Sequence, residues 1–343
     1  MSASTLQPLG ITESVAFDMI VGDLTRRSFF TGMAATTLAA AAACSTTDAT
    51  DGLGNSETRT ITTHYRPVEV PRSPQRVIAA SYWIPFQMYA IGVRPIGVYD
   101  YSGNFDQLSP AMQEFISNVS VIGSWADLEI EAIAALQPDL IIGNAMEIDE
   151  GVFASLSRIA PTAVFSADTR ADWMTILDGV ADSLNQADAL NGLRAEYERT
   201  VAEIAEKYLG KISEHTWASV SFGHGEGEFS LQHPDSAAGA LLAAIGVEFG
   251  RAAAATGTEY SYTTYSTENF TVIDDVTLVV HPVGGRGEPL AAVEAVLAQP
   301  TFQATPAAQT GQVYGVRSLY DVNDYRAAID ALRNLEATVL AQL

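Results

Sequence analysis

The sequence is poor in cysteine, in basic residues and in long apolar runs. A single cysteine among 343 residues means that no disulfide can form within the chain. The 18 Lys and Arg against 41 Asp and Glu give a net charge of −23, which argues against nucleic-acid binding, because such a surface needs many cations. The charge-free stretch 28–43 is shorter than the roughly 20 residues of a membrane-spanning helix.

The motifs of several enzyme classes are also missing. The chain has no GxSxG elbow, no HExxH, no P-loop and no GxGxxG after a predicted strand. The glycine-rich stretch Gly223–Gly227 lacks the P-loop lysine, and no spacing of Ser, His and Asp indicates a catalytic triad. The sequence therefore predicts a protein that is not an enzyme.

Residues 1–44 have the layout of an export signal that ends at the only cysteine. The pair Arg26–Arg27 resembles the twin-arginine motif, and Ala41–Ala43 before Cys44 resemble a bacterial lipobox, although a lipobox more often has Leu where this chain has Ala41. Lipid attachment at Cys44 accounts for a cysteine with no partner. It predicts an extracytoplasmic protein anchored to the outer face of the cytoplasmic membrane.

The polar stretch 45–64 predicts a flexible tether, and the rest of the chain predicts two lobes. Removing residues 1–43 leaves 38 acidic and 16 basic residues and a charge of −22. About 280 residues then remain, more than one hydrophobic core usually holds.

Short apolar strands alternate with helical patterns, which indicates an α/β fold with mostly parallel sheets. The predicted strands of the first lobe are Val77–Ser81, Ile96–Tyr99, Val121–Ile122, Leu140–Gly143 and Thr162–Phe165. Its predicted helices are Pro85–Ile91, Ser109–Asn118, Ile130–Leu136, Glu150–Ile159 and Trp173–Leu184. The predicted strands of the second lobe are Trp217–Phe222, Val247–Phe249, Leu278–His281 and Val313–Val316, and its helices are Ala237–Ile245, Leu290–Ala298 and Tyr325–Leu343.

One long helix separates the two sets of elements. Apolar residues spaced by three or four predict a helix from Ala187 to Leu209, with Gly210 as its C-terminal cap. The predicted organisation is a first Rossmann-like lobe at 65–186, a connecting helix at 187–210 and a second lobe at 211–343. A single rigid helix permits only small tilts, so we expect a largely pre-formed site between the lobes.

An ordered series of short motifs resembles the substrate-binding lipoproteins of bacterial ABC importers for ferric siderophores, haem and cobalamin. The motifs are Pro74–Ile78, Ile91–Val98, Ile122–Gly123, Glu129–Ile142, Ile159–Thr162, Leu241–Val247, Ser266–Glu268 and Gly311–Tyr314. The resemblance runs from about residue 66 to the C-terminus. It implies a monomeric carrier that captures a ferric chelate and delivers it to a permease dimer with its ATPase. It implies no intrinsic cofactor, with iron entering only as part of the ligand.

Two glutamates are identified by this resemblance. Glu131 and Glu268 match the exposed carboxylates, one on each lobe, that dock onto arginines of the permease. Such charges would give steering and register more than affinity. For Glu131 a purely local role at a helix N-terminus is an alternative, since Asp127 and Glu129 lie in the same stretch.

Loops at the carboxyl ends of the strands should line the binding site. In the first lobe these loops contain Tyr82, Trp83, Asp100, Tyr101, Asn104, Ser124, Trp125, Asn144 and Met146. Aromatic rings with isolated arginines suit a bulky chelate with apolar arms. The residues expected to contact ligand across both lobes are Trp83, Tyr101, Trp125, Phe222, His224, Arg286, Arg317 and Tyr320.

The strongly acidic chain favours a hydroxamate or mixed siderophore over a highly anionic tris-catecholate. Haem is an alternative ligand, with Tyr101 or His224 as a possible axial ligand. Direct capture of a transition metal by His224, Glu226, Glu228 and His233 is another, although a solvated glycine-rich loop is the simpler interpretation. Cobalamin, a secreted hydrolase that processes siderophores, and a purely structural surface lipoprotein complete the alternatives.

Overall fold

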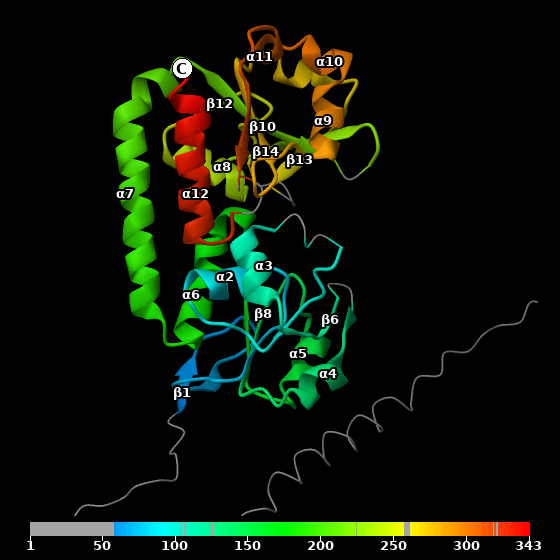
Figure 1. Cartoon of the computed structure of the whole chain (residues 1–343), viewed down its shortest axis with the longest axis vertical. Coiled ribbons are helices and arrows are strands. Elements are labelled where there is room, and N and C mark those ends of the chain that lie inside the picture. Colours follow the sequence, from blue (N-terminus) through cyan, green and yellow to red (C-terminus); the bar gives the residue numbers. More distant parts are fainter. Residues whose placement is uncertain are drawn as a thin grey trace, which may run out of the picture.

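The chain forms two α/β lobes joined by the long helix α7 (Ala187–Ile212), which confirms the predicted fold class (Figure 1). The computed structural model describes residues 58–103, 105, 108–124, 127–223, 225–256, 261–317, 319 and 322–343, with Arg170 by its backbone alone. The predicted signal and Cys44 lie outside these residues. Within them, no helix is both long enough and apolar enough to span a membrane.

The first lobe is built on a five-stranded parallel sheet of order β5-β4-β3-β8-β9. Its strands are β3 (Val77–Ala79), β4 (Gly97–Val98), β5 (Ser120–Val121), β8 (Leu140–Asn144) and β9 (Thr162–Phe165). Every residue of the central strands β3 and β8 is buried, as their continuous apolar sequences predict. The helices are α2 (Ile84–Ala90), α3 (Pro110–Ile116), α4 (Ile130–Ala135), α5 (Glu150–Leu156) and α6 (Trp173–Ser183), and a 3₁₀ turn, η2 (Arg170–Asp172), precedes α6.

Two small antiparallel pairs flank this sheet. The strands β6 (Gly123–Ser124) and β7 (Asp127–Leu128) form one of them. The other joins β1 (Thr58–Ile61) to β2 (Val68–Pro71). The assignment of residues 58–64 to the tether was therefore wrong at β1, where Ile61 is 3% exposed and packs in the core.

The second lobe has a mixed sheet of order β13-β11-β10-β14-β15, and β12 also pairs with β10. The four predicted strands are β10 (Thr216–Phe222), β12 (Glu248–Phe249), β14 (Leu278–Val283) and β15 (Val313–Arg317), and these run parallel. Two unpredicted strands, β11 (Glu228–Gln232) and β13 (Tyr262–Ser266), add antiparallel pairs. The helices are α8 (Ala237–Ala244), α9 (Ala291–Leu297), α10 (Pro300–Gln303), α11 (Pro306–Gln309) and α12 (Tyr325–Leu335), with a 3₁₀ turn η3 (Phe270–Ile273) and a π-helical end η4 (Glu336–Leu340).

The helix α7 is longer than predicted and buries one face. Its 26 residues span ~39 Å. Gly210 does not end the helix, because Ile212 one half-turn further is fully buried, and that burial offsets the roughly 1 kcal/mol cost of a helical glycine. The buried face consists of Leu190, Leu193, Tyr197, Thr200, Ile204, Tyr208 and Ile212.

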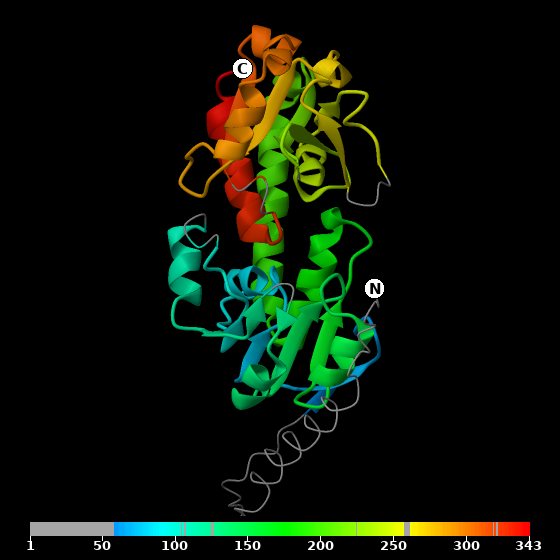
Figure 2. The same cartoon turned by 90° about the vertical axis from the view of Figure 1, so that its right-hand side faces the viewer.

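A second helix, α12, packs alongside α7 and ties the lobes together (Figure 2). At its start, Arg326 Nε donates a hydrogen bond to the carbonyl oxygen of Ala90 at the end of α2 (2.8 Å). Tyr325 is 1% exposed and packs against Trp173 of α6 and Tyr197 of α7. The chain thus crosses between the lobes once through α7, but α12 returns to contact the first lobe.

One continuous apolar core runs from the first lobe, past α7 and α12, to one face of the second sheet. A smaller core covers the opposite face of that sheet. On β14, Leu278 and Val280 face the first core and Val279 faces the second, as the two-residue period of a strand requires. The spacing of the lobes is therefore set by packed side chains as well as by one connecting helix.

Candidate functional site: an aromatic cavity between the lobes

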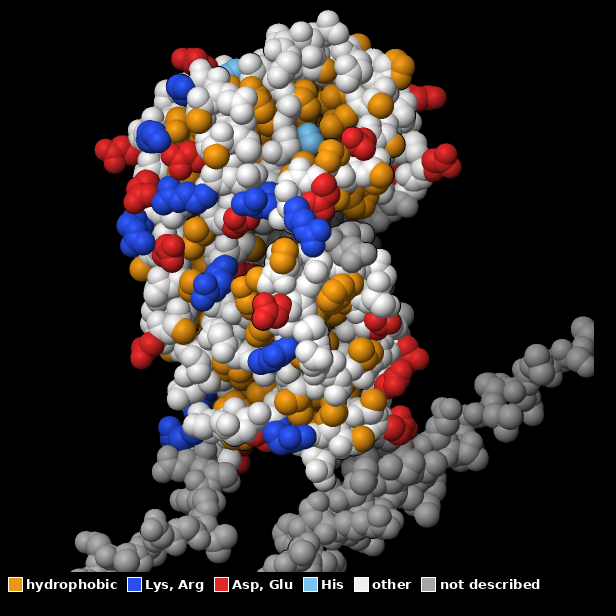
Figure 3. Space-filling model, viewed as in Figure 1, with side chains coloured by type: hydrophobic (Ala, Val, Ile, Leu, Met, Phe, Trp, Pro, Cys, Tyr) orange, Lys and Arg blue, Asp and Glu red, His pale blue; other side chains and the backbone are white. Residues whose placement is uncertain are grey.

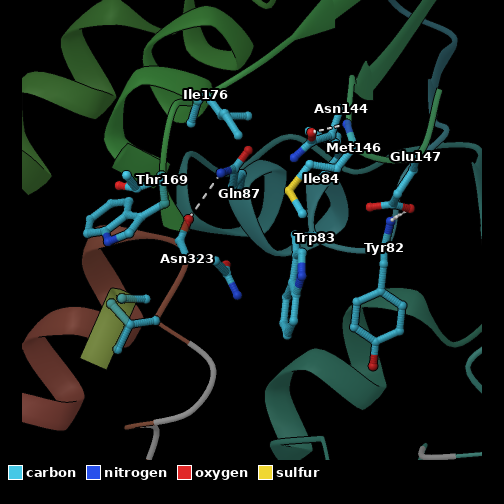
Figure 4. Close-up of a pocket in the computed structure, with 14 residues that line it drawn as sticks. Tyr82, Trp83, Ile84, Gln87, Asn144, Met146, Glu147, Thr169, Ile176 and Asn323 are labelled. Carbon is cyan, nitrogen blue, oxygen red and sulfur yellow. Dashed lines mark hydrogen bonds between the residues drawn. The ribbon is translucent and has the colours of Figure 1, made fainter. Parts of the chain in front are cut away.

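A cavity of about 430 Å³ lies where the two lobes meet. This volume is within the roughly 300–1,000 Å³ of small-molecule sites. The side chains that line it come from the loop after β3, from α2, from the end of β8 and the loops after β8 and β9, from α6, and from the second lobe at α8 and before α12 (Figure 4). They are Tyr82, Trp83, Ile84, Gln87, Asn144, Met146, Glu147, Ala167, Thr169, Trp173, Ile176, Ala237, Val322 and Asn323.

The first-lobe wall of the cavity forms where two neighbouring parallel strands end. β3 and β8 are paired, so the segments that follow them emerge side by side. The Ser81 hydroxyl accepts a hydrogen bond from the backbone N–H of Asn144 (2.8 Å) and ties these segments together. The helix α2 then begins with Pro85 in its first turn. Proline has no backbone N–H, and an N–H at this position would have no partner within the helix. The loops after these two strands thus line the inter-lobe cavity, and their contact with a ligand stays a prediction.

Aromatic rings form a connected cluster on this wall. Tyr82 packs edge-on against Trp83 with ring centroids 4.8 Å apart, and its ring is tilted against that of Tyr101 at 4.9 Å. Phe86 completes the cluster from the first turn of α2. Such pairs contribute about 0.5–1.5 kcal/mol each beyond the area that they bury. The rings are therefore held in place before any ligand arrives.

Of the predicted contact residues, Trp83 lines the cavity and Tyr101 lies behind it. Tyr101 is 3% exposed, and its hydroxyl donates a hydrogen bond to the carbonyl oxygen of Tyr82. Burial raises the pKa of the Tyr101 phenol well above its ordinary value, which keeps it protonated and able to donate. Its place in the structure is thus that of a support for Tyr82.

Three other predicted residues lie away from this cavity. Phe222 packs at the edge of the second lobe's smaller core. Arg286 is exposed in the loop after β14, where its backbone N–H donates to a Glu288 carboxylate oxygen (2.9 Å). Arg317 makes two parallel hydrogen bonds to Asp330 of α12, at 3.0 and 2.9 Å. Ligand contact by these three stays a prediction, as it does for Trp125, His224 and Tyr320, which lie outside the described residues.

Four polar side chains that line the cavity were not found from the sequence: Gln87, Glu147, Thr169 and Asn323. Two of them, Glu147 and Gln87, lie close to predicted loop residues. Glu147 follows Met146, and its Oε2 accepts a hydrogen bond from the backbone N–H of Tyr82 (2.9 Å). Burial raises the pKa of this carboxyl to about 7, against the opposing effects of that hydrogen bond and of the Tyr99 hydroxyl. Near pH 7 the cavity wall therefore carries a group that gains and loses charge.

Gln87 lies one turn into α2 and is 2% exposed. Its Nε2 donates to the backbone carbonyl oxygen of Asn323 in the second lobe (3.1 Å), as the dashed line in Figure 4 shows. This bond holds Nε2 and fixes the orientation of the amide. The other polar atom of the amide is its carbonyl oxygen, Oε1. Oε1 is buried and has no hydrogen-bond partner among the described residues. A glutamine among apolar helical residues gave no sequence signal of this role.

The alternative metal ligands do not form a cluster in the described part of the chain. His233 is fully buried, with Nε2 at 3.1 Å from the Thr263 hydroxyl. The Glu228 carboxylate accepts a hydrogen bond from the backbone N–H of Gly225 (2.8 Å). No group of three or more His, Cys, Asp or Glu among the described residues is placed to hold a metal ion. His224 lies outside them.

The two predicted docking glutamates are exposed, one on each lobe. Glu131 lies in the first turn of α4. Glu268 follows β13, and its backbone N–H donates to the Ser266 hydroxyl (3.3 Å). The space-filling view shows a constriction between the lobes on the side away from α7 (Figure 3). The positions fit the predicted role, which stays a prediction.

Comparisons with known proteins give a consistent picture. A family model described as periplasmic binding protein matches residues 89–320. The probable siderophore-binding lipoprotein YfiY of Bacillus subtilis is 31% identical over 180 residues, which are 52% of this chain and 53% of that protein. The Fe(3+) dicitrate-binding periplasmic protein FecB of Escherichia coli is 27% identical over 51% of this chain and 57% of its own. The chain thus matches little more than half the length of these two relatives.

Solved structures match over a larger share of the chain. The siderophore periplasmic binding protein from the fuscachelin gene cluster of Thermobifida fusca has a TM-score of 0.70 and 25% identity, covering 80% of this chain and 99% of that one. FhuD of Vibrio cholerae, solved with Fe3+–Desferal, has a TM-score of 0.65 at 20% identity over 78% and 98% of the two chains. The latter likeness concerns the fold alone.

Proposed function

Because the chain belongs to the periplasmic binding protein family, we propose that it captures a ferric siderophore in the cavity between its lobes and delivers it to an ABC importer. The observation that carries the proposal is the aromatic cavity, which is held open by packed side chains of both lobes. Rings at its wall suit the apolar arms of a metal chelate. The relatives named for siderophores and ferric citrate support iron chelates as the ligand class.

We infer a hydroxamate or mixed siderophore, in keeping with the strongly acidic chain. No covalent chemistry is proposed for this chain, and ATP hydrolysis belongs to a partner. The iron is cargo inside the chelate, and no intrinsic cofactor takes part. The protein acts as a monomer that exchanges its ligand with a permease dimer.

The proposed anchor is a lipid on Cys44. Two relatives are named as lipoproteins, which supports this anchor. In this proposal, residues 45–57 connect the lipid on Cys44 to the first lobe at the outer face of the membrane. Glu131 and Glu268 are exposed on different lobes, so one docking event can engage both lobes of a loaded protein. Their charges would act mainly on encounter rate and register.

Tryptophan fluorescence tests the ligand class directly. Trp83 and Trp173 line the cavity, so a bound ferric chelate should quench their emission. The panel consists of ferric hydroxamate, mixed and tris-catecholate siderophores, with haem, cobalamin and free Zn²⁺ as competing hypotheses. Saturable quenching by ferric siderophores supports the proposal. Tight binding of haem or free Zn²⁺ with no response to any ferric siderophore would refute it.

Single tryptophan variants locate the binding site. Trp83→Phe should remove much of the quenching, because the indole lies at the cavity wall. Trp217→Phe is the matched control, since Trp217 is fully buried in β10 and its Nε1 donates to the Ile212 carbonyl oxygen (3.2 Å), away from the cavity. Equal loss of quenching in both variants would place the ligand elsewhere.

A further inference from the structure

We propose that Glu147 and Gln87 make this cavity selective for ferric chelates that present hydrogen-bond donors and carry a positive charge rather than a negative one. The inference rests on the proposed function and deepens it, because it assigns the ligand class to two side chains. Neither was singled out by the sequence. Both residues line the cavity, and each carries an acceptor group, one ionisable and one neutral.

The charge balance of the cavity is the first argument. Among the described side chains that line it, Glu147 is the only acidic one, and none is Lys, Arg or His. A chelate with several negative charges would lose its hydration and find no cation among the described side chains of this wall. A chelate with an ammonium group would instead meet a half-buried carboxylate in an apolar setting. Attraction between opposite charges is stronger there than in water.

The unsatisfied acceptor is the second argument, and it is independent of charge. Gln87 is 2% exposed, yet its Oε1 has no hydrogen-bond partner among the described residues. The Nε2 bond to Asn323 prevents the amide from turning this end around without losing a contact between the lobes. A buried acceptor without a donor costs about 1–3 kcal/mol. A ligand that brings an N–H or O–H donor to this position recovers that free energy.

The test uses two chelates that differ in one group. The ferric complex of a linear trihydroxamate with a free terminal ammonium is compared with its N-acetylated form, which is neutral but otherwise the same. A ferric tris-catecholate supplies the anionic case. Affinities come from fluorescence titration of the full chain. We expect the order ammonium form, then N-acetyl form, then tris-catecholate, with roughly a tenfold step between the first two, the size of a hydrogen bond to a charged group.

Glu147→Gln isolates the charge. The glutamine can still accept the hydrogen bond from the Tyr82 N–H, so the structure of the cavity wall is preserved. The ratio of the affinities for the ammonium and N-acetyl forms should fall from about ten to about one. The matched control is Glu150→Gln, which removes the same charge from an exposed position on α5 and should leave the preference unchanged. A preference that persists in Glu147→Gln, or that disappears equally in Glu150→Gln, would overturn the role of Glu147.

Gln87→Met isolates the neutral acceptor. It should weaken both hydroxamates by a similar factor of roughly three to ten, without changing their ratio. Because Gln87 also bonds Asn323 across the lobes, the control is Arg326→Met. That variant removes a different inter-lobe bond, the one to Ala90, at a residue that does not line the cavity. Equal weakening by both variants would show that Gln87 acts only through lobe spacing.

The outcomes separate this inference from the proposed function. If the tris-catecholate binds more tightly than both hydroxamates, the charge preference is wrong and siderophore capture stands. Arg170 follows Thr169 in the sequence, and its side chain is not described, so Arg170→Gln is added to the catecholate titration. If that variant loses tight catecholate binding, the preference for an anionic chelate is due to this arginine. If no ferric chelate binds at all, the proposed function itself fails.

Discussion

Asp324 offers a stability prediction at the joint between the lobes. It is the N-cap of α12, and one carboxylate oxygen accepts hydrogen bonds from the backbone N–H groups of Arg326 (2.7 Å) and Ala327 (3.0 Å). It is only 4% exposed and directly follows Asn323, which lines the cavity. Burial raises its pKa from 3.8 to about 6, in spite of those hydrogen bonds and the nearby Arg326 charge.

The raised pKa determines the sign of the pH dependence. The folded protein holds this proton more tightly than the unfolded chain does, so protonation favours folding. The contribution is fully present below the unfolded pKa near 4 and is lost as the pH rises through the folded pKa of about 6. A difference of about two pKa units corresponds to about 3 kcal/mol. Above about pH 7, the charged carboxylate therefore lowers the free energy of unfolding by roughly this amount.

Asp324→Asn removes the titration while keeping an oxygen that can cap α12. Urea unfolding of the variant and the wild type is measured from pH 4 to pH 8. The variant should gain stability relative to the wild type as pH rises, by up to about 3 kcal/mol, with most of the change between about pH 4 and 6. Asp324→Ser, a second neutral cap, should show the same trend with a constant offset. Parallel pH profiles of variant and wild type, or a gap that shrinks with pH, would refute the reasoning.

Three further predictions concern transport, packing and binding. Glu131→Ala combined with Glu268→Ala should abolish import in cells and leave ferric siderophore affinity within twofold, while a loss of affinity in the purified double variant would contradict the docking role. Gly143→Ala should lower the free energy of unfolding by about 1–3 kcal/mol, because the new Cβ would lie 2.1 Å from Ile148 Cδ1, and an unchanged urea midpoint would show that Ile148 can move aside. Raising the pH from about 6 to 8 should deprotonate Glu147 and increase the preference for an ammonium-bearing chelate over its N-acetyl form. The phenols of Tyr99 and Tyr101 are the other titratable groups that interact with this carboxylate. A preference that does not change with pH in the wild type would contradict the assignment.

The central sheet of the first lobe could be predicted from the sequence, because its strands have a pattern that is recognisable locally. Strands buried on both faces read as continuous apolar runs, and Leu140–Gly143 is such a run. The second lobe was harder to predict. The antiparallel strand β13 is polar and half exposed at the sheet edge, so its sequence resembles a loop. The end of α7 depended on the burial of Ile212, which only the assembled lobe supplies.

The candidate site was predicted only in part, for a related reason. The carboxyl ends of β3 and β8 could be located, so Trp83, Asn144 and Met146 were expected at the site. The residues that give the cavity its chemistry could not. Gln87 matters because Asn323, far away in the sequence, accepts its N–H, and Glu147 matters because folding removes it from water. Both depend on distant contacts, which no local pattern records.

The way the lobes are joined also bears on how the cavity can bind. Tyr325 of α12 packs against Trp173, which lines the cavity, and accepts a hydrogen bond from Arg194 Nε of α7 (3.0 Å). The helix that joins the lobes, the helix that returns to the first lobe and the cavity wall therefore meet at one buried ring. A wide opening of the lobes would have to break this contact and the shared apolar core. Ligand entry must then rely on small tilts and loop movement. Most of the free-energy cost of ordering the site arises during folding rather than during binding.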